Sequence, residues 1–187
     1  MKEFRIAFCF LVCLAIGCSK PQPQKVAVAG VELTLPAGWK VASQKTSDEI
    51  LQGFKSESGS NDDQLHGAWE LRQSQDKATA ILALLSSPLS EELAAEYAKD
   101  PVKAVQAILE AAKEDGTFAV RTNVGARPAL RIEAKEVEEG IELTFIVLNF
   151  IHHERMVSLV FSTASINMNR IGQQFEQVIA SIALSPD

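Results

Sequence analysis

Residues 129–163 read ALRIEAKEVEEGIELTFIVLNFIHHERMVSLVFST, the most strongly patterned segment of the 187-residue chain. The segment contains three strand-like runs, 129–137, 141–151 and 156–163. The polar residues between these runs are few, which is typical of strands that pair through hairpins. The segment therefore predicts an antiparallel meander of three strands.

The middle run of the meander is apolar on both faces. Alternate residues of a strand point to opposite faces. One set comprises Ile141, Leu143, Phe145 and Val147, and the other comprises Ile146, Leu148 and Phe150. A strand with two apolar faces lies in the interior of a layered fold, so a covering layer is expected on each side.

Helices predicted elsewhere in the chain supply these layers. Ser90 is an N-cap for a helix to about Lys99, and Asp100-Pro101 begins a second helix that ends before Gly116. A third helix, 167–183, carries one apolar stripe: Met168, Ile171, Phe175, Val178, Ile179 and Ile182. The third helix is expected to cover one face of the sheet, and the first two are expected to cover the other.

The remaining elements are less regular. They are, in chain order, a strand at 26–35 ending in the turn 36–39, a polar loop at 52–63, and a hairpin of strands 67–73 and 78–85 across 74–77. The Ala and Leu content of 78–85 also suits a helix, but the preceding turn and Pro88 favour a strand.

The N-terminus has the pattern of an export signal. Lys2 and Arg5 precede the uncharged run 6–14, and small residues then lead to Gly17-Cys18. The segment resembles the bacterial lipobox, which implies cleavage between Gly17 and Cys18 and a diacylglycerol-modified, palmitate-bearing Cys18 as the mature N-terminus. A membrane-spanning helix needs about 20 apolar residues, and this run is shorter.

The expected signal defines three parts of the chain. Residues 1–17 form a lipoprotein signal peptide, 18–25 a lipidated cysteine with a Pro/Gln-rich tether, and 26–187 a single globular domain. All three cysteines, Cys9, Cys13 and Cys18, lie at or before the cut. The mature domain can therefore hold no disulfide and no thiolate site.

Charge and location limit the partners. Loss of the signal moves the formal net charge from −6 to −7, because Lys2, Arg5 and Glu3 leave with it. An acidic chain without a basic stripe disfavours nucleic acid as a partner. Ser19, rather than aspartate, follows the cysteine, so sorting to the outer membrane is expected if the source has two membranes.

The order of elements resembles the PsbP-like family, which includes the extrinsic photosystem II subunit, a Ran-binding import factor and envelope proteins related to DcrB. The segments that match are Leu35-Pro36-Ala37-Gly38-Trp39, Gly125-Ala126-Arg127-Pro128-Ala129, the long hairpin and the last helix through Ser181. The resemblance implies an α+β fold in which helices flank both faces of a twisted antiparallel sheet, an α/β/α sandwich. It also implies a binding, assembly or accessory role and carries over no functional residue.

Metal and catalytic sites are weakly indicated. His152-His153 is expected in a solvated turn, since it lacks the spacing and additional ligands of a zinc site. Residues 61–63 could offer oxygens to calcium, but no spaced ligand loop follows, which favours an acidic loop. His66 could belong to a serine triad, although nothing in the sequence selects its companions. No catalytic residue, metal ligand or cofactor is predicted.

Two further sets of side chains could form surfaces. Trp39 and Trp69 are expected in the core rather than in a ligand groove. Arg121, Arg127 and Arg131 lie among glutamates, which favours a solvated face over a basic patch. The sequence thus predicts a non-catalytic envelope lipoprotein that binds a nearby envelope protein. The alternatives are a carrier or sensor of a small apolar ligand between sheet and helices and, third, a hydrolase.

Overall fold

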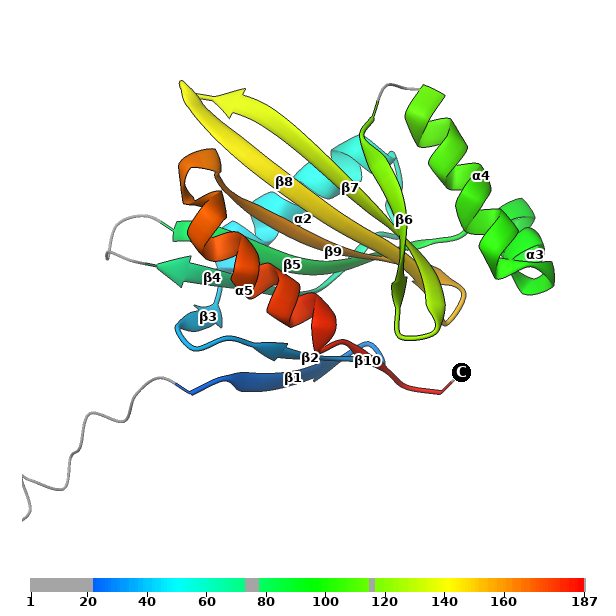
Figure 1. The fold of residues 1–187 in the computed structure, drawn as a ribbon, viewed down its shortest axis with the longest axis horizontal. Helices are drawn as coiled ribbons and strands as arrows, with labels where there is room; N and C mark the ends of the chain where they lie inside the picture. Colours follow the sequence, from blue (N-terminus) through cyan, green and yellow to red (C-terminus); the bar gives the residue numbers. More distant parts are fainter. Residues whose placement is uncertain (1–21, 73–77, 115–116, 187) are drawn as a thin grey trace, which may run out of the picture.

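A computed structural model of the chain describes residues 22–72, 78–114 and 117–186. A seven-stranded antiparallel sheet, in the order β3-β4-β5-β9-β8-β7-β6, forms the centre of this part (Figure 1). Its strands are Trp39–Val41 (β3), Gln64–Arg72 (β4), Ala78–Pro88 (β5), Ala119–Val124 (β6), Arg127–Glu138 (β7), Ile141–His152 (β8) and Arg155–Ala164 (β9). The predicted meander and the strand at 78–85 are confirmed, with ends that differ by at most three residues.

A second, three-stranded sheet joins the two ends of the described chain. It has the order β1-β2-β10 and consists of Gln24–Val28 (β1), Val31–Leu35 (β2) and Ala183–Leu184 (β10). The single strand predicted at 26–35 is wrong, because Ala29 and Gly30 have φ of 52° and 75° and reverse the chain. Gln24 pairs with Leu35, so regular pairing begins two residues before the expected start of the domain.

Four α-helices are present in the described residues, Gln44–Ser58 (α2), Glu91–Lys99 (α3), Pro101–Glu114 (α4) and Met168–Ala180 (α5), and a 3₁₀ turn, Ser165–Asn167, precedes α5. The loop predicted at 52–63 is wrong up to Ser58. Ser43 caps α2 by accepting from the Thr46 N–H at 3.2 Å, and Gly59 ends the helix in the left-handed conformation. α5 ends earlier than predicted because the chain turns at Ser181 into β10.

One face of the large sheet is covered by α5 and the small sheet, and this is where the main core lies (Figure 1). Phe161 of β9 stacks on Phe175 of α5 with ring centroids 4.9 Å apart. Trp39 and Trp69 are 5% and 4% exposed, which confirms their predicted place in the core. The Trp39 indole N–H donates to Gln174 Oε1 at 2.8 Å, so its polar atom is satisfied.

The other face, called here the second face, is covered by separate helices. α2 contacts β4, while Val105 and Leu109 of α4 pack against Ala119 and Leu130 on β6 and β7. Helices thus lie on both faces of an antiparallel sheet, which confirms the predicted α+β class. The cover is incomplete over the central strands, since Phe145 remains only half-buried.

Three hairpins of the structure reverse through two residues that both have positive φ. The turns are Ala29-Gly30, Glu139-Gly140 and His153-Glu154. Paired positive φ angles match the right-handed twist of the flanking strands, and glycine adopts them without strain. The β8–β9 turn differs from the other two because neither of its residues, with φ of 47° and 59°, is a glycine.

Candidate functional sites

The sheet groove is a hollow of about 450 Å³ between α2 and the second face of the large sheet. Half-buried apolar side chains make up much of its lining: Ile50, Phe54, Ile81, Phe145, Val147 and Val160. They come from α2 and from β5, β8 and β9, so segments far apart in the chain build one apolar surface. The groove exists because the covering helices lie over the outer strands.

Two carboxylates lie among the lining residues of the sheet groove. Glu49 comes from α2 and Glu136 from β7, and both side chains are exposed. The ion pair between Lys45 and Glu49 spans 3.7 Å with both side chains largely solvated. A solvated pair of this kind contributes little and opens easily, so the groove presents negative charge beside apolar surface.

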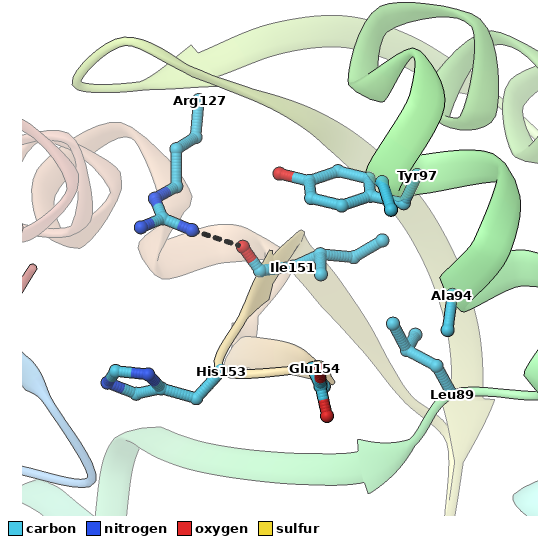
Figure 2. A pocket seen from close by; sticks show the side chains of 8 residues that line it. Leu89, Ala94, Tyr97, Arg127, Ile151, His153 and Glu154 are labelled. Atoms are coloured by element: carbon cyan, nitrogen blue, oxygen red, sulfur yellow. Dashed lines mark hydrogen bonds between the residues drawn. The ribbon is translucent and has the colours of Figure 1, made fainter. Parts of the chain in front are cut away.

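The hairpin pocket is a second hollow, of about 510 Å³, between α3 and the β8–β9 turn (Figure 2). Its lining includes Leu89, Ala94, Tyr97, Arg127, His153 and Glu154. Arg127 extends across one wall, where its Nη1 donates to the Ile151 carbonyl at 3.3 Å. The Tyr97 hydroxyl points toward this guanidinium in Figure 2. One wall of the pocket is therefore apolar and the other carries charge.

The two adjacent histidines do not share one environment. His152 is the last residue of β8 and only 2% exposed, whereas His153 is exposed, so the prediction of a solvated turn is wrong for His152. The positive φ of His153 turns its ring back onto His152, with centroids 3.9 Å apart. Both Nε2 atoms lie near Ser185 Oγ, at 3.4 and 3.2 Å. The pair ties the β8–β9 turn to the C-terminal segment.

His66 has a serine partner, but the arrangement is buried. Its Nε2 lies 2.8 Å from Ser86 Oγ, and Ser86 is 1% exposed. Arg155 Nε donates to the same hydroxyl at 2.8 Å. Burial, and next the charge of Arg155, lower the pKa of His66, which favours the neutral imidazole. Neither His66 nor Ser86 lines the two hollows described above.

The remaining predicted residues are dispersed. Arg131 pairs with Glu133 and Glu176, while Arg127 lines the hairpin pocket, so the three arginines do not act as one patch. Asp63 is buried, which departs from the expected open acidic loop. Within residues 22–72, 78–114 and 117–186, no group of three histidine or carboxylate side chains is arranged to hold a metal ion. Gly17 and Cys18 lie outside the described residues.

No described helix combines the length and hydropathy that crossing a bilayer requires.

No family model matches the sequence. No curated protein matches it either.

Solved structures share the fold at low sequence identity. A Bacteroides thetaiotaomicron protein matches with 12% identity and a TM-score of 0.53 over 90% of this chain, which spans half the length of that protein. LpqN of Mycobacterium tuberculosis, described as involved in cell envelope biogenesis, matches with 13% identity and a TM-score of 0.51, covering 88% of this chain and 91% of LpqN. A Synechocystis PsbP matches with 13% identity and a TM-score of 0.41, covering 90% and 95%. At these identities the matches with the Bacteroides protein and LpqN show a common fold.

Proposed function

We propose that this chain is a lipid-anchored lipoprotein of the cell envelope whose domain is a non-catalytic binding module. The sheet groove is the docking surface, and its occupant is a segment of an envelope protein that is apolar on one side and carries basic residues. Cys18 holds the domain near the membrane, on the periplasmic face of the outer membrane in a two-membrane cell. The PsbP-like resemblance and the described role of LpqN in the envelope support a module of this kind.

The observation that carries the proposal is the apolar lining of the sheet groove. Phe145 and Val147 of β8 remain half-buried although the opposite face of this strand is fully packed, and Ile50 of α2 beside them is half-buried too. Contiguous exposed apolar surface of this kind marks sites of interaction. Glu49 and Glu136 beside it favour a partner with basic groups, because opposite charges across an interface guide association.

Site-specific photocrosslinking in the cells of origin tests this surface. A benzoylphenylalanine is placed at Phe54 in the groove, and the matched control carries it at Ile166, which is 91% exposed elsewhere. We expect one recurrent protein adduct from position 54 and not from position 166. Val147→Glu should abolish the adduct, and Glu136→Lys should weaken it, whereas Glu110→Lys on α4 should leave it unchanged.

Two results would count against the docking proposal. One is an adduct that forms equally at positions 54 and 166. The other is an adduct at position 54 that survives Val147→Glu, since a partner seated in the groove must contact that strand. If the adducted segment carries no basic residues, the charge argument fails while the groove itself stands.

The lipid anchor has a separate test. Cys18→Ser removes the thiol that receives the lipid, so the variant should move from the membrane fraction to the soluble fraction. Cys13→Ser, which changes a cysteine of the expected signal peptide, is the matched control and should leave the protein in the membrane fraction. Retention of Cys18→Ser in membranes would contradict the anchor.

A carrier of a small apolar ligand is the second candidate, because the same groove falls within the volume range of small-molecule pockets. Organic extraction of the purified chain followed by mass spectrometry distinguishes the two. A stoichiometric apolar compound, lost in Val147→Glu, would favour the carrier over the docking module.

A further inference from the structure

The hairpin pocket has an apolar wall whose side chains are only partly covered by protein, although Tyr97 also packs against the cluster around Val105 and Leu130. α3 has no buried residue, although Ala94 and Tyr97 occupy the side that faces the pocket. Leu89, in the segment that leads into α3, extends the same wall. Figure 2 shows these side chains on the α3 side of the hollow, facing Ile151. The wall suits an apolar or aromatic group of a small molecule.

The opposite wall carries one group of each charge. Arg127 comes from the start of β7, and Glu154 comes from the β8–β9 turn. In Figure 2 they lie on opposite sides of Ile151. A planar guanidinium matches the geometry of a carboxylate, and a carboxylate accepts hydrogen bonds from an ammonium. Their charges sum to zero, which favours a ligand with both charges over an anion.

The backbone of the turn points to a role for the Glu154 side chain. Ala29-Gly30 and Glu139-Gly140 place glycine at the second position of the same turn geometry, whereas this turn has Glu154 at φ of 59°. A side chain in the left-handed region is strained, and glycine is not. Of these three turns, only the β8–β9 turn has a strained residue at its second position. That residue, Glu154, lines the hairpin pocket.

We propose that the hairpin pocket binds a small zwitterion with an apolar body, of the class of an α-amino acid with an aromatic or branched side chain. Arg127 binds the carboxylate and Glu154 binds the ammonium, while Leu89, Ala94 and Tyr97 contact the body. A volume of about 510 Å³ accommodates such a molecule. This site shares no lining residue with the sheet groove, so it stands apart from the function proposed above.

The single tyrosine of the chain is Tyr97, which provides a clean reporter. The full chain is labelled with ring-¹³C tyrosine and titrated with L-phenylalanine, which carries both charges and an aromatic body. We expect the one tyrosine signal to shift saturably. 3-Phenylpropionate lacks the ammonium and 2-phenylethylamine lacks the carboxylate, so each should bind at least about tenfold more weakly, the loss of one charged contact.

Variants separate recognition from stability. Glu154→Gly should raise the urea midpoint, because glycine relieves the strained turn, and should weaken L-phenylalanine binding about tenfold. A residue with only a structural role would not produce these opposite effects. Arg127→Gln should weaken binding similarly, whereas Arg121→Gln, which removes an exposed guanidinium on β6, should leave it unchanged.

Three outcomes would overturn the proposal. The first is the absence of a saturable tyrosine shift with L-phenylalanine at concentrations up to about 10 mM, well above a millimolar Kd. The second is 3-phenylpropionate binding as tightly as L-phenylalanine, which would make the pocket an anion site. The third is unchanged L-phenylalanine affinity in Glu154→Gly.

Discussion

At the scale of single residues, His66 links the stability of the fold to pH. Its Nε2 shares a hydrogen bond with the Ser86 hydroxyl, which accepts from Arg155. Protonation of the imidazole would place a cation in a partly buried site near Arg155. The folded state therefore binds a proton at His66 less readily than the unfolded chain, consistent with the lowered pKa.

The expected result is a loss of stability on acidification. Between pH 6.5 and the lower folded pKa the unfolded chain binds more protons at this residue, so the free energy of unfolding rises with pH in that window. Urea unfolding from pH 7.5 down to pH 5 measures it. His66→Gln should flatten the dependence over this window, and an unchanged slope in that variant would refute the assignment.

The structure leaves no room for a side chain at Gly30. A Cβ there would lie 2.7 Å from both His152 Nε2 and Ser185 Oγ, and φ is +75°. Gly140 has φ of +80° in the same kind of turn, but a Cβ added there would meet no other atom within 4 Å. The two glycines therefore share the backbone requirement and differ in their surroundings.

We predict that Gly30→Ala destabilises the chain more than Gly140→Ala. Left-handed strain alone costs about 1–2 kcal/mol in either variant, and only the first also displaces the buried His152. Urea unfolding of both variants measures the difference. Equal losses of stability would show that the histidine cluster yields to the methyl group without cost.

At the scale of elements, α2 forms one wall of the sheet groove, and its position depends on local capping. Ser43 accepts from the Thr46 N–H at the start of the helix. Ser43→Ala should lower the free energy of unfolding by about 1 kcal/mol, while Ser43→Asp, which keeps a cap, should retain most of it. Chemical denaturation provides the measurement, and wild-type stability in Ser43→Ala would show that packing alone holds α2.

The elements differ in how clearly the sequence predicts them. The strands β7, β8 and β9 follow from long apolar patterns, and α3 and α4 follow from Ser90 and Asp100-Pro101, whose capping contacts are present. α2 is not predicted, because the run 52–63 is polar and contains glycine. The helical spacing of the apolar residues Ile50 and Phe54, four positions apart, is too short a pattern to outweigh this composition. The sheet groove and the hairpin pocket could not be predicted from the sequence for a different reason. Their residues come from segments far apart, so only the tertiary structure reveals them.

At the scale of the whole molecule, the C-terminal segment supplies an edge strand, β10, of the small sheet. Ala183 and Leu184 pair with Glu32 and Val31, and the Ser185 N–H donates to the Gly30 carbonyl at 2.9 Å. No fully buried residue of the main core comes from β10, whose Leu184 packs against the edge of that core. The two parts of the molecule should therefore respond differently to loss of the last residues.

Deletion of residues 183–187 should leave the large sheet folded but lower the free energy of unfolding by about 2 kcal/mol, the value of two or three backbone hydrogen bonds. Hydrogen exchange at β2 should accelerate more than at β8. Urea unfolding together with amide exchange tests both statements. Equal acceleration in the two strands would show that the small sheet and the core unfold as one unit.

The order of the small sheet has a mechanical consequence. β1 lies at its edge, pairs only with β2 within that sheet and is the first strand of the described residues. Tension applied at the N-terminus loads the Gln24–Leu35 pair before any other and peels β1 away pair by pair. Five released residues lengthen the connection by about 17 Å, while the aromatic packing of Phe161 and Phe175 stays outside the path of the load. A pull on the chain before Gln24 would therefore detach β1 from β2 before it loads the main core.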